Sequence, residues 1–170
     1  MLFRSMDEFN QAFDTLLNQN LENLILDLSG NGGGYLDVAV KLANQFLPED
    51  KLIVYTEGLH SPKKDFLSNT TGRFLDGRLI VLIDEGSASA SEILSGAVQD
   101  WDRGVIIGRR SFGKGLVQRP IELPDGSMRR LTVTHYYTPT GRSIQKPYDK
   151  GYKEYAKDII NRFEHGEFVS

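Results

Sequence analysis

The chain has 170 residues, of which 39% are hydrophobic and 25% are charged, values typical of one globular domain with its own core. Its formal net charge of -3 at pH 7 gives no electrostatic basis for binding nucleic acid or anionic lipid. Because the sequence has no cysteine, disulfides, thiolate metal sites and a cysteine nucleophile are excluded, and no apolar run approaches the roughly 20 residues of a membrane span.

Hydrophobic periodicity predicts alternating helices and strands along the chain. Ser5 and Glu8 form a capping-box pattern before the first helix, and Pro48 ends the second. In chain order, the pattern predicts a helix over 5–18, a strand over 24–28, a helix over 36–46, a strand over 52–55, a strand over 79–83, a helix over 90–101, strands over 105–107, 116–120 and 131–137, and a surface helix over 152–163.

Two turn-rich segments separate these elements. The polar stretch from Glu57 to Arg78 is predicted to be a long loop, and Pro124-Asp125-Gly126 marks a hairpin turn. Strand–helix alternation before the hairpin predicts an α/β fold with crossover connections, to which the hairpin adds antiparallel strands. Without an internal repeat or second core, residues 1–170 are expected to form one domain. Leu2–Arg4 already reads as a strand and no signal peptide precedes it, so a fragment of a longer protein is expected.

Three serines lie among small residues after the strand at 79–83, in Glu85-Gly-Ser-Ala-Ser-Ala-Ser-Glu92. Ser89 precedes Glu92 by three residues, so it can cap the helix that follows. The same position suits a nucleophile, because free N–H groups at a helix N-terminus stabilise an oxyanion. The pattern leaves both interpretations open. It differs from a nucleophile elbow, because Ser91 stands where that motif has glycine.

One lysine lies between two glycines after the strand at 105–107. The segment from Gly108 to Lys114 matches G-x-x-x-x-G-K of a phosphate-binding loop. Gly115 replaces the hydroxyl residue of that loop, and a strand rather than a helix follows, which argues against phosphate binding. The glycines instead favour a partly buried amine that can accept a serine proton, with Gln118 placed to hydrogen-bond it. A flexible surface lysine is the alternative.

The segment Asn31-Gly-Gly-Gly34 follows the strand at 24–28. It reads either as a plain turn or as a loop that lets a peptide backbone approach and presents an N–H to a ligand. The histidines are poor bases: His60 lies in the polar loop, His165 near the end, and His135 on a strand. No carboxylate or histidine cluster has metal-ligand spacing, so no metal site is expected.

Together these motifs resemble the catalytic domain of the carboxyl-terminal processing proteases, also called tail-specific proteases. The resemblance runs from about Asn23 to Tyr148. It rests on four segments, Leu26-Asp-Leu-Ser-Gly-Asn-Gly-Gly-Gly34, Gly86-Ser-Ala-Ser-Ala-Ser-Glu92, Ala97-Val-Gln-Asp100 and Gly108 with Ser111-Phe-Gly-Lys-Gly115. It implies a crotonase-like spiral of strand–helix units.

The resemblance also implies roles for individual residues. Ser89 matches the family's nucleophile, Lys114 its base and Gln118 the residue that positions the lysine, while the N–H groups of Gly33 and Ala90 match its oxyanion hole. It implies a serine endopeptidase of the periplasm or cell envelope that cleaves unfolded or tagged proteins near their C-termini. Such enzymes use no cofactor, and they often form homo-oligomers.

Three features depart from the family pattern. The chain is expected to lack the PDZ domain that usually precedes the catalytic core, and the N-terminal segments that complete the cleft. Ser29 stands where the family's Asp-Leu-Arg-x-Asn motif has arginine. A catalytically impaired core or a peptide-binding module is therefore the alternative. Acyl-CoA chemistry on the same fold is a third, which gives Lys114 no role.

Overall fold

A computed structural model describes residues 5–168 of the chain. The predicted strand at Leu2–Arg4 lies outside the described residues. The elements are α1 (Ser5–Leu17), β1 (Asn23–Asp27), α2 (Leu36–Ala43), β2 (Leu52–Gly58), β3 (Ser61–Leu67), β4 (Arg78–Ile83), α3 (Ala90–Asp100), β5 (Val105–Gly108), β6 (Leu116–Glu122), β7 (Met128–Tyr137) and α4 (Gly151–Glu164).

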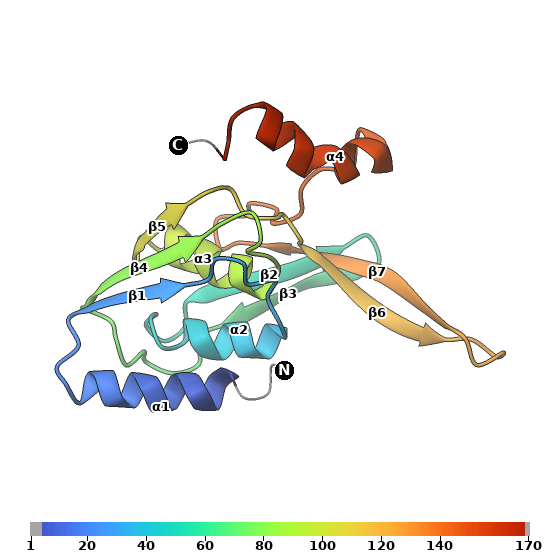
Figure 1. Cartoon of the computed structure of the whole chain (residues 1–170). Coiled ribbons are helices and arrows are strands. Elements are labelled where there is room, and N and C mark those ends of the chain that lie inside the picture. Colours follow the sequence, from blue (N-terminus) through green and yellow to red (C-terminus); the bar gives the residue numbers. More distant parts are fainter. Residues whose placement is uncertain (1–4, 169–170) are drawn as a thin grey trace.

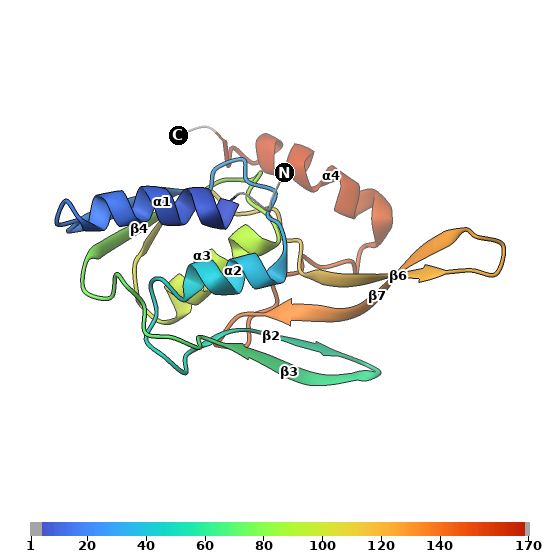
Figure 2. The same cartoon turned by 90° about the horizontal axis from the view of Figure 1, so that it is seen from below.

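The strands form two sheets around one buried helix. One sheet is parallel, in the order β1-β4-β5, and the other is antiparallel, in the order β3-β2-β7-β6. Helix α3 contacts β5 of the first sheet and β2 of the second, and Figures 1 and 2 show it between them. The predicted α/β fold with crossovers and an added hairpin is confirmed.

The core surrounds α3, in which every residue from 91 to 98 is buried. Apolar side chains from α1, α2 and both sheets pack against it, including Phe13, Phe46, Val54 and Val81. Burying side chains of this size stabilises a fold by about 1.5–3 kcal/mol each. This rigid helix sets the position of the loop before it, which carries the three serines.

The prediction of a long loop from Glu57 to Arg78 is wrong for its first part. Residues Ser61–Leu67 form β3, which pairs with β2 in a hairpin. β3 is an edge strand with mostly exposed residues, so its sequence is polar and lacks the apolar alternation of a half-buried strand. Pro62 fits there because an edge strand can leave one N–H position unpaired.

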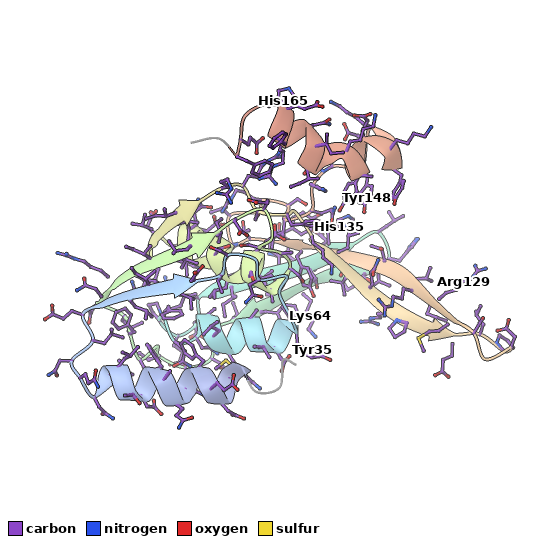
Figure 3. All side chains as sticks on the ribbon, in the orientation of Figure 1. Tyr35, Lys64, Arg129, His135, Tyr148 and His165 are labelled. Atoms are coloured by element: carbon purple, nitrogen blue, oxygen red, sulfur yellow. The ribbon has the colours of Figure 1, made fainter. Side chains whose placement is uncertain are left out.

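The β6–β7 hairpin extends from the body as a two-stranded arm (Figure 2). The predicted turn at 124–126 forms its tip, where the Gly126 N–H donates to the Leu123 carbonyl at 2.9 Å. β7 begins at Met128, three residues before the predicted strand. In Figure 3, Arg129 lies toward the end of the arm, whereas His135 lies near the body.

Helix α4 lies at the opposite end of the molecule from α1 in Figure 1. Its bounds, Gly151–Glu164, confirm the predicted helix at 152–163 to within one residue at each end. Within residues 5–168, no helix has the length and apolar character needed to cross a membrane.

Candidate active site

The three motifs follow the three strands of the parallel sheet. The glycine loop (28–35) follows β1, the serine loop (84–89) follows β4, and the lysine loop (109–115) follows β5. Because the strands are parallel and adjacent, their carboxyl ends lie at one edge of the sheet, where α/β folds build their sites. The fold therefore brings the three predicted motifs to one edge.

Ser89 differs from the two serines beside it. Ser87 and Ser91 are buried, and their hydroxyls donate to the glycine loop, Ser87 to the Leu28 carbonyl at 2.7 Å and Ser91 to the Asn31 carbonyl at 2.9 Å. Ser89 is only partly buried and has φ 56° and ψ −111°. Such a conformation costs a non-glycine residue about 1–3 kcal/mol and occurs mostly at functional sites.

Ser89 also caps α3, so the two interpretations of its position are compatible. It forms a capping box with Glu92, in which its backbone N–H donates to Glu92 Oε2 at 2.8 Å. Ala90 is the first residue of α3, and its N–H therefore has no partner within the helix. The start of α3 thus leaves the Ala90 N–H as a hydrogen-bond donor beside the Ser89 side chain.

Gly33 packs directly against the backbone on either side of Ser89. A Cβ at Gly33 would lie 2.3 Å from the Ala88 carbonyl oxygen and 2.6 Å from the Ala90 nitrogen, and Gly33 has φ +87°. Only glycine fits this position. The Gly33 N–H donates to Asn31 Oδ1 at 3.0 Å, so an oxyanion between Gly33 and Ala90 has to replace the Asn31 oxygen as its acceptor.

Asp84 joins the glycine loop to the serine loop. Its Oδ1 accepts the N–H of Gly30 at 2.7 Å, of Gly86 at 2.8 Å and of Ser87 at 3.1 Å. These bonds, above all the one from Gly30, lower the pKa of the Asp84 carboxyl below its ordinary value. Sequence reasoning missed this role; the only signal was an acidic residue between an apolar strand and a glycine.

Glu92 joins the serine loop to the lysine loop. Glu92 belongs to the first turn of α3, and the residue is 5% exposed. Besides the Ser89 N–H, it accepts the Lys114 N–H at 2.9 Å, the Gly113 N–H at 2.6 Å and the Ser111 hydroxyl at 2.7 Å. The sequence marked Glu92 only as a capping residue, because its other partners are distant in the chain. One buried carboxylate therefore fixes the backbones of both loops.

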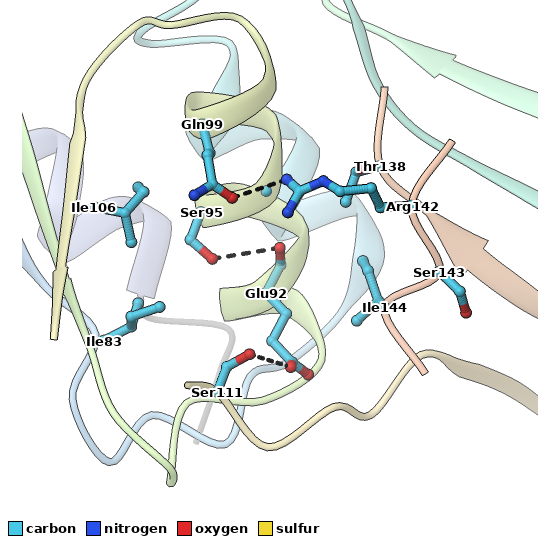
Figure 4. Close-up of a pocket in the computed structure, with 11 residues that line it drawn as sticks. Ile83, Glu92, Ser95, Gln99, Ile106, Ser111, Thr138, Arg142, Ser143 and Ile144 are labelled. Atoms are coloured by element: carbon cyan, nitrogen blue, oxygen red, sulfur yellow. Dashed lines mark hydrogen bonds between the residues drawn. The ribbon is translucent and has the colours of Figure 1, made fainter. Parts of the chain in front are cut away.

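Two cavities adjoin these residues. One of about 180 Å³ borders Glu92 and is lined by α3, β4, β5 and residues 138–144. Figure 4 shows the Ser111–Glu92 bond at its edge and Arg142 paired with Gln99. The other, of about 90 Å³, is mainly apolar and lies between Gly33 and Ala90 and the side chains of Val38, Leu42 and Leu94. This cavity has room for a small apolar group beside the N–H groups of Gly33 in the glycine loop and Ala90 in α3.

The prediction that Lys114 is partly buried is wrong. Lys114 is exposed, although its backbone N–H is bonded to Glu92. Gln118 lies on β6 and is also exposed. Among residues 5–168, no side-chain hydrogen bond joins Lys114 to Gln118 or to Ser89. The fold places these residues on adjoining segments, and in the described residues their side chains are not joined by a hydrogen bond.

None of the three histidines belongs to the glycine, serine or lysine loop, although His135 pairs in register with Leu116, which directly follows the lysine loop. His135 is on β7, with its ring centre 6.5 Å from that of Tyr137, and His60 is in the β2–β3 turn. Figure 3 places His165 beside α4, far from His135. In the described part of the chain, no group of three or more His, Asp or Glu side chains is arranged to hold a metal ion.

Comparisons with known proteins agree on one family. The sequence profile of peptidase family S41 matches residues 2–153. A carboxyl-terminal-processing protease of Synechocystis sp. is 41% identical over 139 residues, which are 82% of this chain and 32% of that protein. A carboxy-terminal-processing protease of Bartonella bacilliformis is 46% identical over 126 residues, which are 74% of this chain and 29% of that protein.

A solved structure is similar as well. The photosystem II D1 C-terminal processing protease aligns with a TM-score of 0.79 and 35% identity, over 86% of this chain and 38% of that chain. The chain thus spans about a third of the length of these relatives. The extent of the profile match and the identity to named proteases lead to one conclusion: the chain belongs to peptidase family S41, with the carboxyl-terminal processing proteases among its relatives.

Proposed function

We propose that this chain is the catalytic core of a serine endopeptidase that cleaves proteins near their C-termini. The observation that carries the proposal is the backbone of Ser89, a non-glycine residue with φ 56° at the start of α3. Gly33 lies against it and Ala90 follows it. Family membership and the names of the relatives support the same reaction.

In the proposed reaction, Ser89 Oγ attacks the substrate carbonyl carbon while Lys114 Nζ accepts the hydroxyl proton. The carbonyl oxygen becomes an oxyanion that accepts hydrogen bonds from the N–H groups of Ala90 and Gly33, replacing Asn31 Oδ1 at the latter. Lys114 then donates its proton to the leaving amine as the peptide C–N bond breaks. Water then attacks the Ser89 ester carbon while Lys114 Nζ accepts a water proton, and that proton passes to Ser89 Oγ as the ester C–O bond breaks and the carboxylic acid is released.

Lys114 has to turn its side chain toward Ser89 to accept this proton. Its backbone is fixed to Glu92, the residue that also holds the Ser89 backbone, so the turn requires only side-chain rotation. We propose that Gln118 then bonds the amine and orients it.

Three further features belong to the proposal. The strand–helix units form a crotonase-like spiral, as the family resemblance implies. The apolar cavity of about 90 Å³ beside Gly33 and Ala90 receives a small apolar substrate side chain next to the scissile bond. By the same resemblance, the enzyme works in the periplasm or cell envelope and acts on the C-terminal segments of unfolded or tagged proteins.

The test is cleavage of matched peptides with a free or an amidated C-terminus, using the full chain and Ser89→Ala. We expect the parent chain to cleave the peptide with the free C-terminus and Ser89→Ala to be inactive. Equal cleavage by both chains would contradict the proposal. Binding of peptide without cleavage by the parent chain would instead assign a peptide-binding module.

A further inference from the structure

Helix α4 contacts the lysine loop from the side opposite Glu92. The family profile matches residues 2–153, so nearly all of α4 (Gly151–Glu164) lies beyond the match. In Figure 1, α4 is separate from both sheets. Its attachment to the molecule therefore depends on a few specific contacts, and these contacts converge on the residues around Lys114.

Arg162 provides the first contact. It is 2% exposed, in a helix whose other residues are mostly exposed. Its guanidinium donates to the Arg110 carbonyl in the lysine loop at 2.5 Å and to Glu167 at 2.8 Å. Arg110 in turn pairs with Glu167 at 3.1 Å and with Asp158 of α4 at 3.6 Å. A buried arginine thus joins α4 to the start of the lysine loop.

Lys146 provides the second contact. Its Nζ lies 3.2 Å from Asp158 of α4 and over two rings, that of Tyr155 at 4.1 Å and that of Phe112 at 4.7 Å. Tyr155 belongs to α4 and Phe112 to the lysine loop. The backbone N–H of Lys146 also donates to the Gly113 carbonyl at 3.0 Å. Lys146 therefore connects the helix to the residue directly before Lys114.

Gln145 provides the third contact. It is buried, and its Oε1 accepts the Gly115 N–H at 3.0 Å while its Nε2 lies 3.4 Å from the Tyr155 hydroxyl. The fit is close, because a Cβ at Gly115 would lie 2.4 Å from the Gln145 nitrogen. Gln145 thus connects α4 to the residue directly after Lys114.

Lys114 is consequently held between two supports. Glu92 bonds the N–H groups of Gly113 and Lys114 from the serine side. Residues 145 and 146, supported by α4, bond the Gly113 carbonyl and the Gly115 N–H from the other side. Because the Lys114 side chain is exposed, its direction depends on how firmly this backbone is held. A misplacement of 1 Å can slow a reaction by about a hundredfold.

We propose that α4 is a positioning element for Lys114, acting through Arg162 and the Gln145–Lys146 segment. The proposal rests on the proposed function, in which Lys114 is the base. It assigns Arg162 a positioning role, since that residue acts through the lysine loop. Loss of α4 contacts should therefore slow the chemical step without weakening substrate binding.

The test compares three variants of the full chain. Arg162→Ala removes the buried link, and Arg162→Lys keeps one donor. Lys157→Ala is a matched control that removes a charge from the exposed face of α4, where Lys157 pairs with Glu154 at 3.8 Å. The measurements are kcat and KM for a peptide, the rate of Ser89 acylation by a fluorophosphonate, and hydrogen exchange of the Gly113 and Gly115 amides.

We expect Arg162→Ala to lower kcat and the acylation rate by about tenfold to a hundredfold, with KM nearly unchanged. The rates of Arg162→Lys should lie between those of Arg162→Ala and the parent chain. The rates of Lys157→Ala should equal those of the parent chain. Hydrogen exchange of the Gly113 and Gly115 amides should be faster than in the parent chain only in the Arg162 variants. Parent-like kcat in Arg162→Ala, or an equal loss in Lys157→Ala, would overturn the proposal. If Arg162→Ala does not fold, Arg162→Lys is decisive by the same criteria.

Failure of the proposed function gives a different result. In that case the parent chain is not labelled at Ser89, and the exchange of Gly113 and Gly115 decides whether α4 holds the loop. Faster exchange in Arg162→Ala than in Lys157→Ala would support the positioning contact, and equal exchange would overturn it.

Discussion

The serine side and the lysine side of the site are built in different ways. Ser89 begins a helix that lies in the core, and Asp84, Ser87 and Ser91 bond its loop to the glycine loop. Lys114 lies on an exposed loop beyond the parallel sheet. Its backbone is bonded to Glu92 on one side and, through Gln145 and Lys146, to the C-terminal segment on the other.

The serine side and the lysine side therefore depend on different parts of the chain for the positions of their residues. The serine side is fixed by contacts among residues 27–92, which join the glycine loop to the serine loop and to the helix α3 in the core. The lysine side depends on residues from 92 to 167, several of which lie in a helix beyond the family match. Substitutions on the two sides should therefore differ in how they divide their effects between stability and catalytic rate.

The largest effect is expected from the two proposed reacting groups. Ser89→Ala and Lys114→Ala should each lower the rate of peptide cleavage by several orders of magnitude, and the double variant should be no slower than either, because nucleophile and base act as a unit. Ser87→Ala should keep far more activity. Cleavage by Ser89→Ala together with an inactive Ser91→Ala would show that the nucleophile has been assigned to the wrong serine.

The next largest effect should come from breaking the junction between the two sides. Glu92→Gln replaces two acceptor oxygens by one and places an amide against backbone donors, leaving buried groups unpaired. We expect a loss of about 3 kcal/mol in the free energy of unfolding, measured by urea denaturation. Glu85→Gln is the control, since Glu85 pairs with Arg109 at the surface, and its loss of stability should be far smaller than that of Glu92→Gln. Equal losses would mean that Glu92 does not join the loops.

The pH dependence of the free energy of unfolding should test the role of Asp84 on the serine side. The Gly30 N–H lowers the pKa of the folded Asp84 carboxyl, so the unfolded chain binds its proton more readily than the folded one. The stability that Asp84 contributes is full above its unfolded pKa of about 4 and is lost as pH falls through the lower folded pKa. Unfolding free energies between pH 2 and 6 should therefore fall more steeply with acid in the parent than in Asp84→Asn. Parallel curves would contradict this role.

The smallest effect is expected at position 29, where the family motif has arginine. Ser29 is exposed and its N–H donates to Asp27 Oδ1 at 2.9 Å. Bonds from the Ser29 N–H and hydroxyl lower the pKa of the Asp27 carboxyl, and the Asp84 carboxylate opposes them. Ser29→Arg replaces the hydroxyl by a cation that attracts both carboxylates, so it should raise the melting temperature by about 2 °C or less. Ser29→Gln, which adds length without charge, should not. A similar rise in both variants would point to packing rather than charge.

The sequence predicted most of the fold because its signals are local. Apolar periodicity located α1, α3 and α4, and Pro124–Gly126 located the hairpin turn. β3 was missed because an edge strand with exposed faces carries a polar sequence without apolar alternation. Its pairing with β2 depends on the neighbouring strand rather than on its own residues.

The site was predicted in part, for a related reason. The sequence placed each of the three motifs directly after a strand, and the parallel pairing of those strands brings their loops to one edge. The joining roles of Asp84 and Glu92 involve partners up to 54 residues away, so no local pattern shows them. The burial of Lys114 was predicted wrongly because glycines around a lysine show that the backbone is close to other segments, here Gln145 and Lys146, and do not show where the side chain lies.

The most direct measurement is peptide mapping by mass spectrometry after treatment of the full chain with a fluorophosphonate. We expect one covalent adduct, on Ser89, that forms rapidly in the parent chain and is nearly absent in Lys114→Ala, while the fold of both chains is verified by circular dichroism. An adduct on Ser87 or Ser91, or equal labelling of Ser89 in Lys114→Ala, would contradict the central claim that Ser89 and Lys114 act together.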